Sequence, residues 1–151
     1  MRCRVRVKYP KLSQTPGFLL WQISIEWQRL QREALANLDL THVQFVLLAT
    51  IHSIESKNEM LSQVKLSSIA NVDAMMTSHV LRSLEKRNLV KREKNPSDTR
   101  AMILSTTQEG RDLLTKALKV VEEVDSKYLG RAGEDTQDLV NKLKKLTQAS
   151  I

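Results

Sequence analysis

Apolar residues recur at helical spacing over most of the chain. Between Gly17 and Pro96 lie 78 residues without a glycine or a proline, a pattern that argues against short strands joined by tight turns. Apolar positions three and four apart predict a first helix over about residues 16–37, whose apolar stripe holds Leu20, Ile23, Trp27, Leu30 and Ala34. Thr41 and Gln44 have the spacing of a capping box and therefore predict the start of a second helix.

Two short helices follow, near residues 63–70 and 73–87, separated by Asn71 and Val72. Such a short connection is typical of a helix-turn-helix, although an ordinary helical hairpin has the same pattern. Asn71 and Asn88 are expected to take the left-handed backbone conformation at the two helix ends. Asp73 is expected to cap the second short helix.

The next segment changes to an extended pattern. Residues 89–94 alternate and are basic, residues 95–98 form a turn cluster, and residues 101–106 return as an apolar-rich strand, which together predict a β-hairpin or wing. Helical spacing resumes after Thr107, and a last helix follows a break at 130–133. The fold expected is mainly α with a small β-hairpin. Apolar stripes left over on the first and last helices predict a helical dimer interface, with packing inside one chain as the alternative.

Composition limits the class of protein. The 151 residues hold a single cysteine, Cys3, so no disulfide framework is possible within the chain. The length suits one globular domain that needs no staple. No stretch approaches the ~20 consecutive apolar residues of a membrane span, so we expect a cytoplasmic protein without a membrane partner.

Charge is concentrated in two segments. Lys and Arg number 24 against 17 Asp and Glu, and the excess lies in residues 1–11 and 82–100. A basic patch on a slightly acidic body is typical of a protein that binds a polyanion such as nucleic acid. A merely solvated surface is the alternative.

The order of elements and several residues resemble the MarR family of bacterial winged-helix transcription regulators. The resemblance is densest over residues 61–110, where it includes Leu84-Glu85-Lys86-Arg87-Asn88-Leu89-Val90, Asp98-x-Arg100-Ala101, Thr107 and Gly110. It implies a winged helix-turn-helix domain over residues 14–151, with a winged core at about 41–110. Dimerisation helices are implied at about 16–37 and 108–149, and residues 1–13 form a basic extension. Asn71 and Asn88 replace the family's usual glycines, and Thr106 replaces a leucine.

The resemblance implies a homodimer that binds double-stranded DNA at a pseudo-palindromic operator, usually as a repressor. On the second short helix, a rotation of 100° per residue predicts that Met76, Val80 and Leu84 are buried. The opposite side faces the major groove, and the candidates for reading bases there are Ala74, Met75, Thr77 and Ser78.

Other side chains are candidates for contacts with the DNA backbone. Arg82 and His79 lie further along the outward face, and Ser62 and Gln63 begin the first short helix, where N–H groups attract phosphate. In the wing, the family resemblance implies that Asp98 orients the hairpin and that the basic tip enters the adjacent minor groove. The candidates for reaching the minor groove are Arg92, Lys94 and Arg100.

The family resemblance also implies a small effector, often phenolic or otherwise lipophilic, bound between the dimerisation helices and the winged domain. Four side chains on the first two predicted helices could line its pocket: Trp21, Trp27, His42 and His52. For the two tryptophans, a place in the core or in the dimer interface is the alternative reading.

The sequence also bears on three other classes of function. An enzyme lacks support, because the chain has no glycine-rich phosphate loop and no nucleophile elbow, and because His52 and Glu55 alone do not make a zinc site. No metal or cofactor is therefore expected. Redox sensing through Cys3, whose thiolate Arg2 and Arg4 would favour, is a second alternative. A winged-helix module that binds protein partners is the third, but its outward face should be broadly apolar rather than basic.

Overall fold

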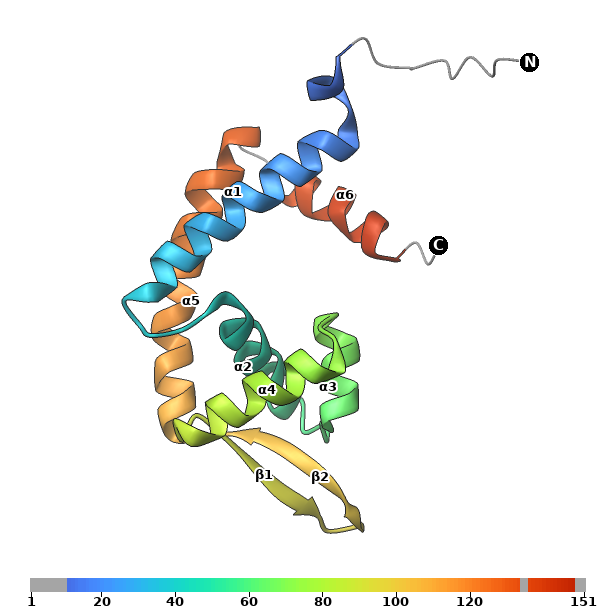
Figure 1. Cartoon of the computed structure of the whole chain (residues 1–151), viewed down its shortest axis with the longest axis vertical. Helices are drawn as coiled ribbons and strands as arrows, with labels where there is room; N and C mark the ends of the chain where they lie inside the picture. The colour runs from blue at the N-terminus through green and yellow to red at the C-terminus, as the bar shows by residue number, and fades with distance from the viewer. Residues whose placement is uncertain (1–10, 134–135, 149–151) are drawn as a thin grey trace, which may run out of the picture.

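The computed structural model describes residues 11–133 and 136–148, without the side chains of residues 99–101 and 148. In chain order the elements are η1 (Leu12–Gln14), α1 (Pro16–Ala36), α2 (His42–Glu55), α3 (Gln63–Ala70), α4 (Ala74–Lys86), β1 (Val90–Asn95), β2 (Asp98–Thr106), α5 (Gln108–Leu129), η2 (Gly130–Ala132) and α6 (Thr136–Gln148). Figure 1 shows two parts: a winged core made of α2, α3, α4 and the hairpin of β1 and β2, and above it a long helical arm made of α1, α5 and α6. The last helix, α6, stands to one side. The prediction of a mainly helical fold with a small β-hairpin is confirmed.

Local chemistry sets the ends of these helices. The predicted capping box is present, since Thr41 Oγ1 accepts from the Gln44 N–H and Gln44 Oε1 accepts from the Thr41 N–H. Asp73 Oδ1 accepts from the Met76 N–H at 2.8 Å and begins α4, as expected. Asn71 and Asn88 both have positive φ, at 51° and 55°, which confirms their predicted left-handed conformation. At both helix ends an asparagine therefore adopts the left-handed conformation that glycine most often takes there.

One hydrophobic core holds α2, α3, α4 and the hairpin together. Its largest fully buried apolar side chains come from four helices and the loop before α3: Leu35, Leu47, Leu48, Ile51, Leu61, Leu66, Leu81 and Leu84. Ala117 of α5 is buried with them. Leu89, Val90 and Leu104 extend this core into the base of the hairpin. The Leu104 N–H also donates to the Leu61 carbonyl at 2.9 Å, which ties β2 to the start of α3. The position of the hairpin relative to α3 is therefore fixed at its base.

The start of α5 explains the threonine and glycine that follow the hairpin. Thr107 Oγ1 accepts from the Gly110 N–H at 2.9 Å and donates to the Asn88 carbonyl at 2.7 Å. A Cβ placed on Gly110 would lie 2.1 Å from the Leu89 carbonyl oxygen, so no side chain fits there. The close approach of helix and hairpin thus requires glycine at this position.

Thr106, which replaces the family's usual leucine at the base of the hairpin, is buried and makes hydrogen bonds. Its N–H and Oγ1 both donate to Glu55 Oε2, at 3.1 and 2.5 Å. Arg111 Nη1 donates to the Thr106 carbonyl at 2.8 Å. A polar network therefore replaces the apolar packing that a leucine would give.

The arm is less completely packed than the winged core. α1 packs against α5 along its C-terminal half, where Gln31 and Leu35 are buried. Leu20 and Ile23, which were predicted to face a partner element, are exposed, as are Leu19, Trp21 and Ile25. Leu143 and Leu146 of α6 are exposed as well. Within the described ranges, no helix has the length and apolar character that crossing a membrane requires.

Candidate nucleic-acid interface

The helix α4 lies across the winged core with one face buried and one outside. Its buried residues are Thr77, Val80, Leu81 and Leu84, which follow the i, i+3, i+4, i+7 pattern of a single helical stripe. The outer face carries Ala74, Met75, His79 and Arg82, all of them exposed, with Ser78 half-buried beside them.

Two predictions on α4 were wrong. Met76, expected in the core, is 45% exposed, and Thr77, a candidate for reading bases, is fully buried. The buried stripe is centred about 90° around the helix from Met76, because Thr77 and Leu81 belong to it. Thr77 Oγ1 also faces the Val72 carbonyl, at 3.4 Å, so its hydroxyl points into the turn before α4 rather than outwards.

The outer face near the start of α4 is apolar at its centre and charged at its edge. Met75 is 82% exposed, and a shallow hollow beside it is lined by Asp73, Met75, Met76, His79 and Arg82. Arg82 Nε donates to the Ser78 carbonyl at 3.3 Å, which leaves the Arg82 side chain along the helix surface. This arrangement presents thioether groups next to a guanidinium, a combination that suits a thymine methyl group next to a phosphate.

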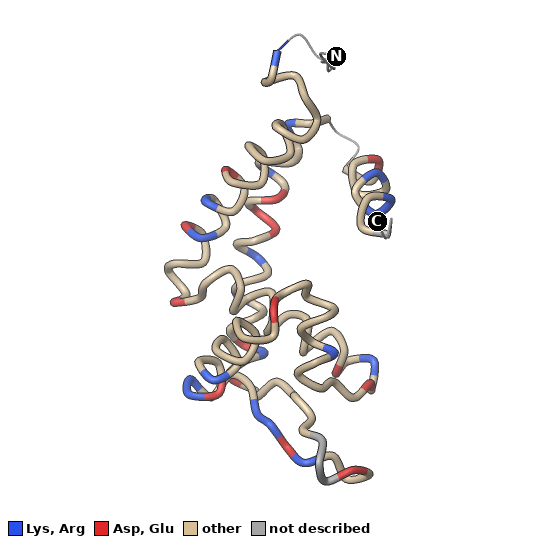
Figure 2. Tube along the Cα trace, turned by 45° about the vertical axis from the view of Figure 1, so that its right-hand side comes forward, with Lys and Arg blue, Asp and Glu red and all other residues tan. Residues whose placement is uncertain are grey.

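The hairpin is a two-stranded antiparallel ribbon that lies below α4 in Figure 1. β1 pairs with β2 from Val90↔Thr106 to Lys94↔Met102, and the register shifts between Lys94 and Asn95. The turn is shorter than predicted, with Pro96 and Ser97 between the strands. The Ser97 N–H donates to Asn95 Oδ1 at 2.9 Å and so stabilises the turn. Figure 2 shows a run of basic positions along β1, interrupted by one acidic residue.

The predicted wing residues differ in their surroundings. Lys94 and Asp98 are exposed, whereas the side chain of Arg100 lies outside the described part of the chain. Arg92 is half-buried at the base of the hairpin: its Nε lies 2.9 Å from Glu85 Oε1 of α4, and its Nη1 donates to Gln63 Oε1 of α3 at 3.2 Å. Arg92 thus points toward the helices rather than away from them.

The start of α3 offers donors of a different kind. Ser62 is the N-cap, and its Oγ accepts from the Lys65 N–H at 3.2 Å. Gln63 Oε1 accepts from Arg92 Nη1, so its donors toward a phosphate are the side-chain Nε2 and the main-chain N–H. Main-chain N–H groups at a helix start remain suited to an anion.

Two of the four predicted effector residues lie together where α1, α2 and α5 meet. The rings of Trp27 and His42 are 5.0 Å apart and nearly perpendicular. Trp27 Nε1 donates to Asp125 Oδ1 at 2.7 Å, and Gln31 Nε2 donates to the same oxygen at 2.8 Å. Burial lowers the pKa of His42 from its ordinary value, and the nearby charge of Asp125 only partly opposes this shift.

The other two effector candidates lie elsewhere. Trp21 is exposed on α1, against Phe18 and a shallow hollow that Tyr128 also lines. His52 is ten residues beyond His42, which places it about 15 Å further along α2. The structure therefore brings Trp27 and His42 together but not Trp21 and His52.

Sequence reasoning missed Gln31 and Asp125, the polar residues of this junction. Gln31 is fully buried, and its Oε1 has no hydrogen-bond partner among the described residues. The signal was present, because Gln31 follows Trp27 by four positions and so shares its helix face. A polar residue on a stripe that is otherwise apolar indicates a buried hydrogen-bond network.

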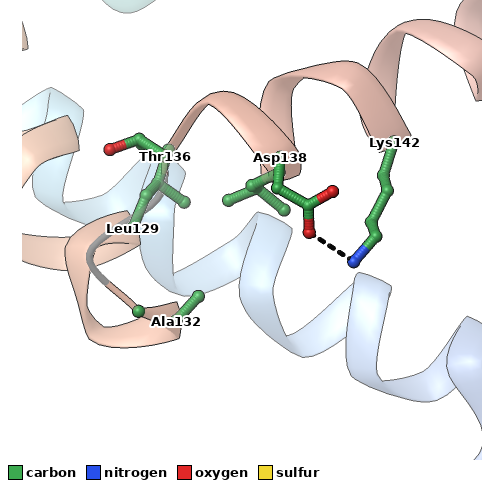
Figure 3. Close-up of a pocket in the computed structure, with 7 residues that line it drawn as sticks. Leu129, Ala132, Thr136, Asp138 and Lys142 are labelled. Carbon is green, nitrogen blue, oxygen red and sulfur yellow. Dashed lines mark hydrogen bonds and ion pairs between the residues drawn. The ribbon is translucent and has the colours of Figure 1, made fainter.

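A separate small hollow, about 170 Å³, lies where α5 gives way to α6. Figure 3 shows Leu129, Ala132 and Thr136 around it, with the ion pair between Asp138 and Lys142 on one side, 2.6 Å long. None of the predicted site residues lines it. In the described ranges no group of three or more His, Cys, Asp or Glu residues could hold a metal ion. Cys3 lies outside the described residues.

Comparison with known proteins agrees with this geometry. Residues 40–102 match the model of the MarR family. Over 125 residues the chain is 43% identical to YdcH of Bacillus subtilis (strain 168), an uncharacterized HTH-type transcriptional regulator, and the match covers 83% of this chain and 85% of that one. The name of this relative describes a transcriptional regulator rather than an enzyme.

Two solved structures of similar fold show the regulator CouR, once with DNA and once with a small molecule. The transcriptional repressor CouR bound to a 23-mer DNA duplex has a TM-score of 0.80 and 26% identity, over 94% of this chain and 99% of that one. CouR from Rhodococcus jostii RHA1 bound to p-coumaroyl-CoA has a TM-score of 0.81 and 22% identity, over 95% and 99% of the two chains. With the winged core and the relatives in agreement, the chain belongs to the MarR family of winged-helix transcriptional regulators.

Proposed function

We propose that the protein is a sequence-specific repressor that binds a pseudo-palindromic operator as a homodimer and is released by a small effector. The observation that carries this proposal is the outer face of α4, where exposed Met75, in the first turn, shares a shallow hollow with Arg82, about two turns further along a helix that packs on the core. Rigid support matters because base readout requires the helix to be held close to its bound position. A protein with this role acts on the chromosome, in the cytoplasm.

The residues of the interface have distinct proposed roles. Ala74, Met75 and Ser78 read base edges in the major groove, because they lie in the first half of α4 on its outer side. Arg82 and His79 contact the phosphate backbone, together with Ser62 and the main-chain N–H of Gln63. Lys94 and Arg100 carry the wing into the adjacent minor groove, with Asp98 orienting it.

The dimer is supported by the apolar surface that one chain leaves exposed. Leu19, Leu20, Ile23 and Ile25 on α1, with Leu143 and Leu146 on α6, are too many large apolar side chains for an ordinary solvated surface. A two-fold axis through these helices repeats α4 in the second chain. Half-sites would then lie about 10 bp apart, one turn of the DNA helix.

The effector is proposed to bind at the junction of α1, α2 and α5, beside Trp27 and His42. The aromatic rings there and the orphan Gln31 Oε1 offer both apolar contact and a hydrogen-bond acceptor. A lipophilic or phenolic compound has the matching chemistry, since a phenol donates one hydrogen bond from an apolar ring. CouR, of the same fold, is a precedent for a regulator that binds both DNA and an aromatic acyl compound.

The test is fluorescence anisotropy with a labelled DNA fragment from upstream of the protein's own gene and a scrambled fragment of equal length, each at several salt concentrations. We expect saturable binding by two protomers, tighter than to the scrambled fragment by about 10³-fold or more, and weakening steeply with salt. Equal binding to both fragments, followed by no enriched sequence in a selection from random DNA, would contradict the proposal.

Two variants then separate base readout from backbone contact. Met75→Ala should change the ranking of operators that differ at single base pairs. Arg82→Ala should weaken all of them alike and lower the salt slope by about one. Lys119→Ala, on the exposed surface of α5, removes the same charge as Arg82→Ala away from the interface and should change neither. Identical effects from Met75→Ala and Arg82→Ala would contradict the assigned roles.

A further inference from the structure

Arg92 is the basic residue of the hairpin that differs most from its neighbours. It was predicted to reach the DNA minor groove, yet its guanidinium contacts Glu85 on α4 and Gln63 on α3. The three side chains thus join the strand β1 to both helices of the helix-turn-helix. The contact with Glu85 is an ion pair in which Arg92 Nε makes no hydrogen bond among the described residues, whereas the contact with Gln63 is a hydrogen bond from Nη1.

Shielding from solvent distinguishes this ion pair from the one next to it. The side chains of Arg92 and Glu85 are only 24% and 29% exposed. Lys91 and Glu93, on the same strand, form an ion pair whose side chains are 51% and 62% exposed. An exposed pair is worth little, whereas a shielded pair with a further hydrogen bond fixes geometry more firmly.

The location of the contact determines what it can control. The base of the hairpin is already fixed by Leu89, Val90 and Leu104 in the core. Beyond that base, Glu93, Lys94 and Met102 are exposed, and the two strands remain paired with each other. Arg92 lies opposite Leu104, where the ribbon leaves the core. Among the described residues, its contact with Glu85 joins the side of the ribbon to α4 at that level, so the contact orients the hairpin relative to the helix.

We propose that Arg92 and Glu85, with Gln63, form a clamp that sets the position of the wing relative to α4, and that Arg92 is a positioning residue rather than a DNA contact. This inference rests on the proposed DNA binding for its consequence. Its structural part stands on the contacts alone. The wing tip, with Lys94, would reach the minor groove only when the clamp holds the ribbon at the correct angle.

The clamp makes a prediction opposite in sign to simple electrostatics. Glu85→Gln removes a negative charge close to the proposed DNA surface, which on charge alone should tighten binding. If the clamp positions the wing, the same substitution should weaken operator binding, by about fivefold. Glu93→Gln is the matched control, because it removes the same charge from β1 without touching α4. Binding by Glu85→Gln that equals or exceeds that of Glu93→Gln would overturn the proposal.

A double-mutant cycle tests whether Arg92 acts through Glu85. Arg92→Met keeps an apolar stem of similar length and removes the guanidinium. We expect it to weaken operator binding by about fivefold in the wild-type background and by less than about twofold in the Glu85→Gln background. A loss of the same size in both backgrounds would mean that Arg92 contacts DNA directly, and would overturn the positioning role.

Hydrogen exchange on the free protein gives a readout that does not depend on DNA. Glu85→Gln should speed exchange of the β1 and β2 amides beyond the base of the hairpin, while the amides of α2 and α5 keep their wild-type rates. Unchanged wing exchange, or faster exchange throughout the chain, would overturn the clamp. Absence of operator binding by the wild-type protein would instead count against the proposed function, and this exchange experiment would still decide the clamp.

Discussion

The winged core and the arm solve the problem of apolar surface in different ways. In the core, side chains from α2, α3, α4 and the hairpin bury one another, and Leu47, Leu48, Leu81 and Leu84 have no exposed surface. In the arm, the N-terminal half of α1 and the whole of α6 keep large apolar side chains exposed. The core is therefore complete within one chain, whereas the arm has the composition of a surface that is to be covered.

This contrast predicts which property a substitution in each region will change. A change in the core should act on the stability of the single chain, because every contact there is internal. A change in the exposed half of the arm should act on association and leave the fold of the single chain intact. A core substitution that changes only association, or an arm substitution that unfolds the single chain, would contradict this assignment.

The largest effect is expected at Gly110, where the core is tightest. Gly110→Ala places a Cβ against the Leu89 carbonyl oxygen, a backbone atom that cannot move without shifting the hairpin. We expect a loss of about 3 kcal/mol in the free energy of unfolding, the upper part of the range for overpacking. Chemical unfolding followed by circular dichroism measures it.

Gly17 provides the matched control for that substitution. A Cβ on Gly17, in the first turn of α1, would meet no other atom within 4 Å. Gly17→Ala should therefore be neutral, or stabilising by up to about 1 kcal/mol, because alanine favours a helix. Equal losses from the two substitutions would contradict the tight contact at Gly110.

The next effect is expected in the arm and concerns association. Ile23→Glu puts a carboxylate into the exposed apolar face of α1, which the proposed dimer buries. We expect dimer dissociation to become about 100-fold easier, equal to about 2.7 kcal/mol, with the helix content of the chain unchanged. Sedimentation equilibrium over a range of protein concentrations measures the change.

Asn37→Asp is the control in the arm, since it adds the same charge at the exposed C-terminal end of α1, about 21 Å along the helix from Ile23. It should leave the dimer as stable as before. A monomeric wild-type protein, or a variant Ile23→Glu that dimerises normally, would show that another occupant covers the apolar face.

The same contrast explains how far the sequence could be interpreted. In the core, each local signal agreed with the packing: Thr41, Asp73 and Asn71 marked helix ends, and all three have the predicted geometry. Capping and left-handed positions depend on neighbours a few residues away, which is why one sequence is enough to find them.

The errors came from contacts between distant elements. Helical periodicity placed Met76 in the core, but the packing of α4 on α2 chose a stripe through Thr77 instead. Likewise, nothing local to Arg92 shows that Glu85 and Gln63 will enclose it. A side chain's direction on a helix edge or on a ribbon is decided by tertiary packing, and pattern alone leaves it open by about a quarter turn.

The smallest effect is expected at the junction between core and arm, and it depends on pH. Burial lowers the pKa of His42 below 6.5, its ordinary value, so the folded protein keeps this imidazole neutral where the unfolded chain takes up a proton. The unfolded state then binds more protons, and the free energy of unfolding falls as pH drops through about 6.5 toward the lower folded pKa. One such group gives a slope of at most about 1.4 kcal/mol per pH unit, and the partial solvent access of His42 reduces it well below that limit.

The measurement is urea unfolding between about pH 7.5 and 5.0 for the wild type, His42→Gln and His79→Gln. His42→Gln should flatten the dependence on pH, because glutamine takes up no proton in this range. His79→Gln replaces an exposed histidine on α4, away from the junction, and is the matched control. If the two variants show the same dependence of unfolding free energy on pH, the burial of His42 does not make the junction sensitive to pH. The stability of the arm on the core would then depend on the hydrogen bonds of Asp125 to Trp27 and Gln31.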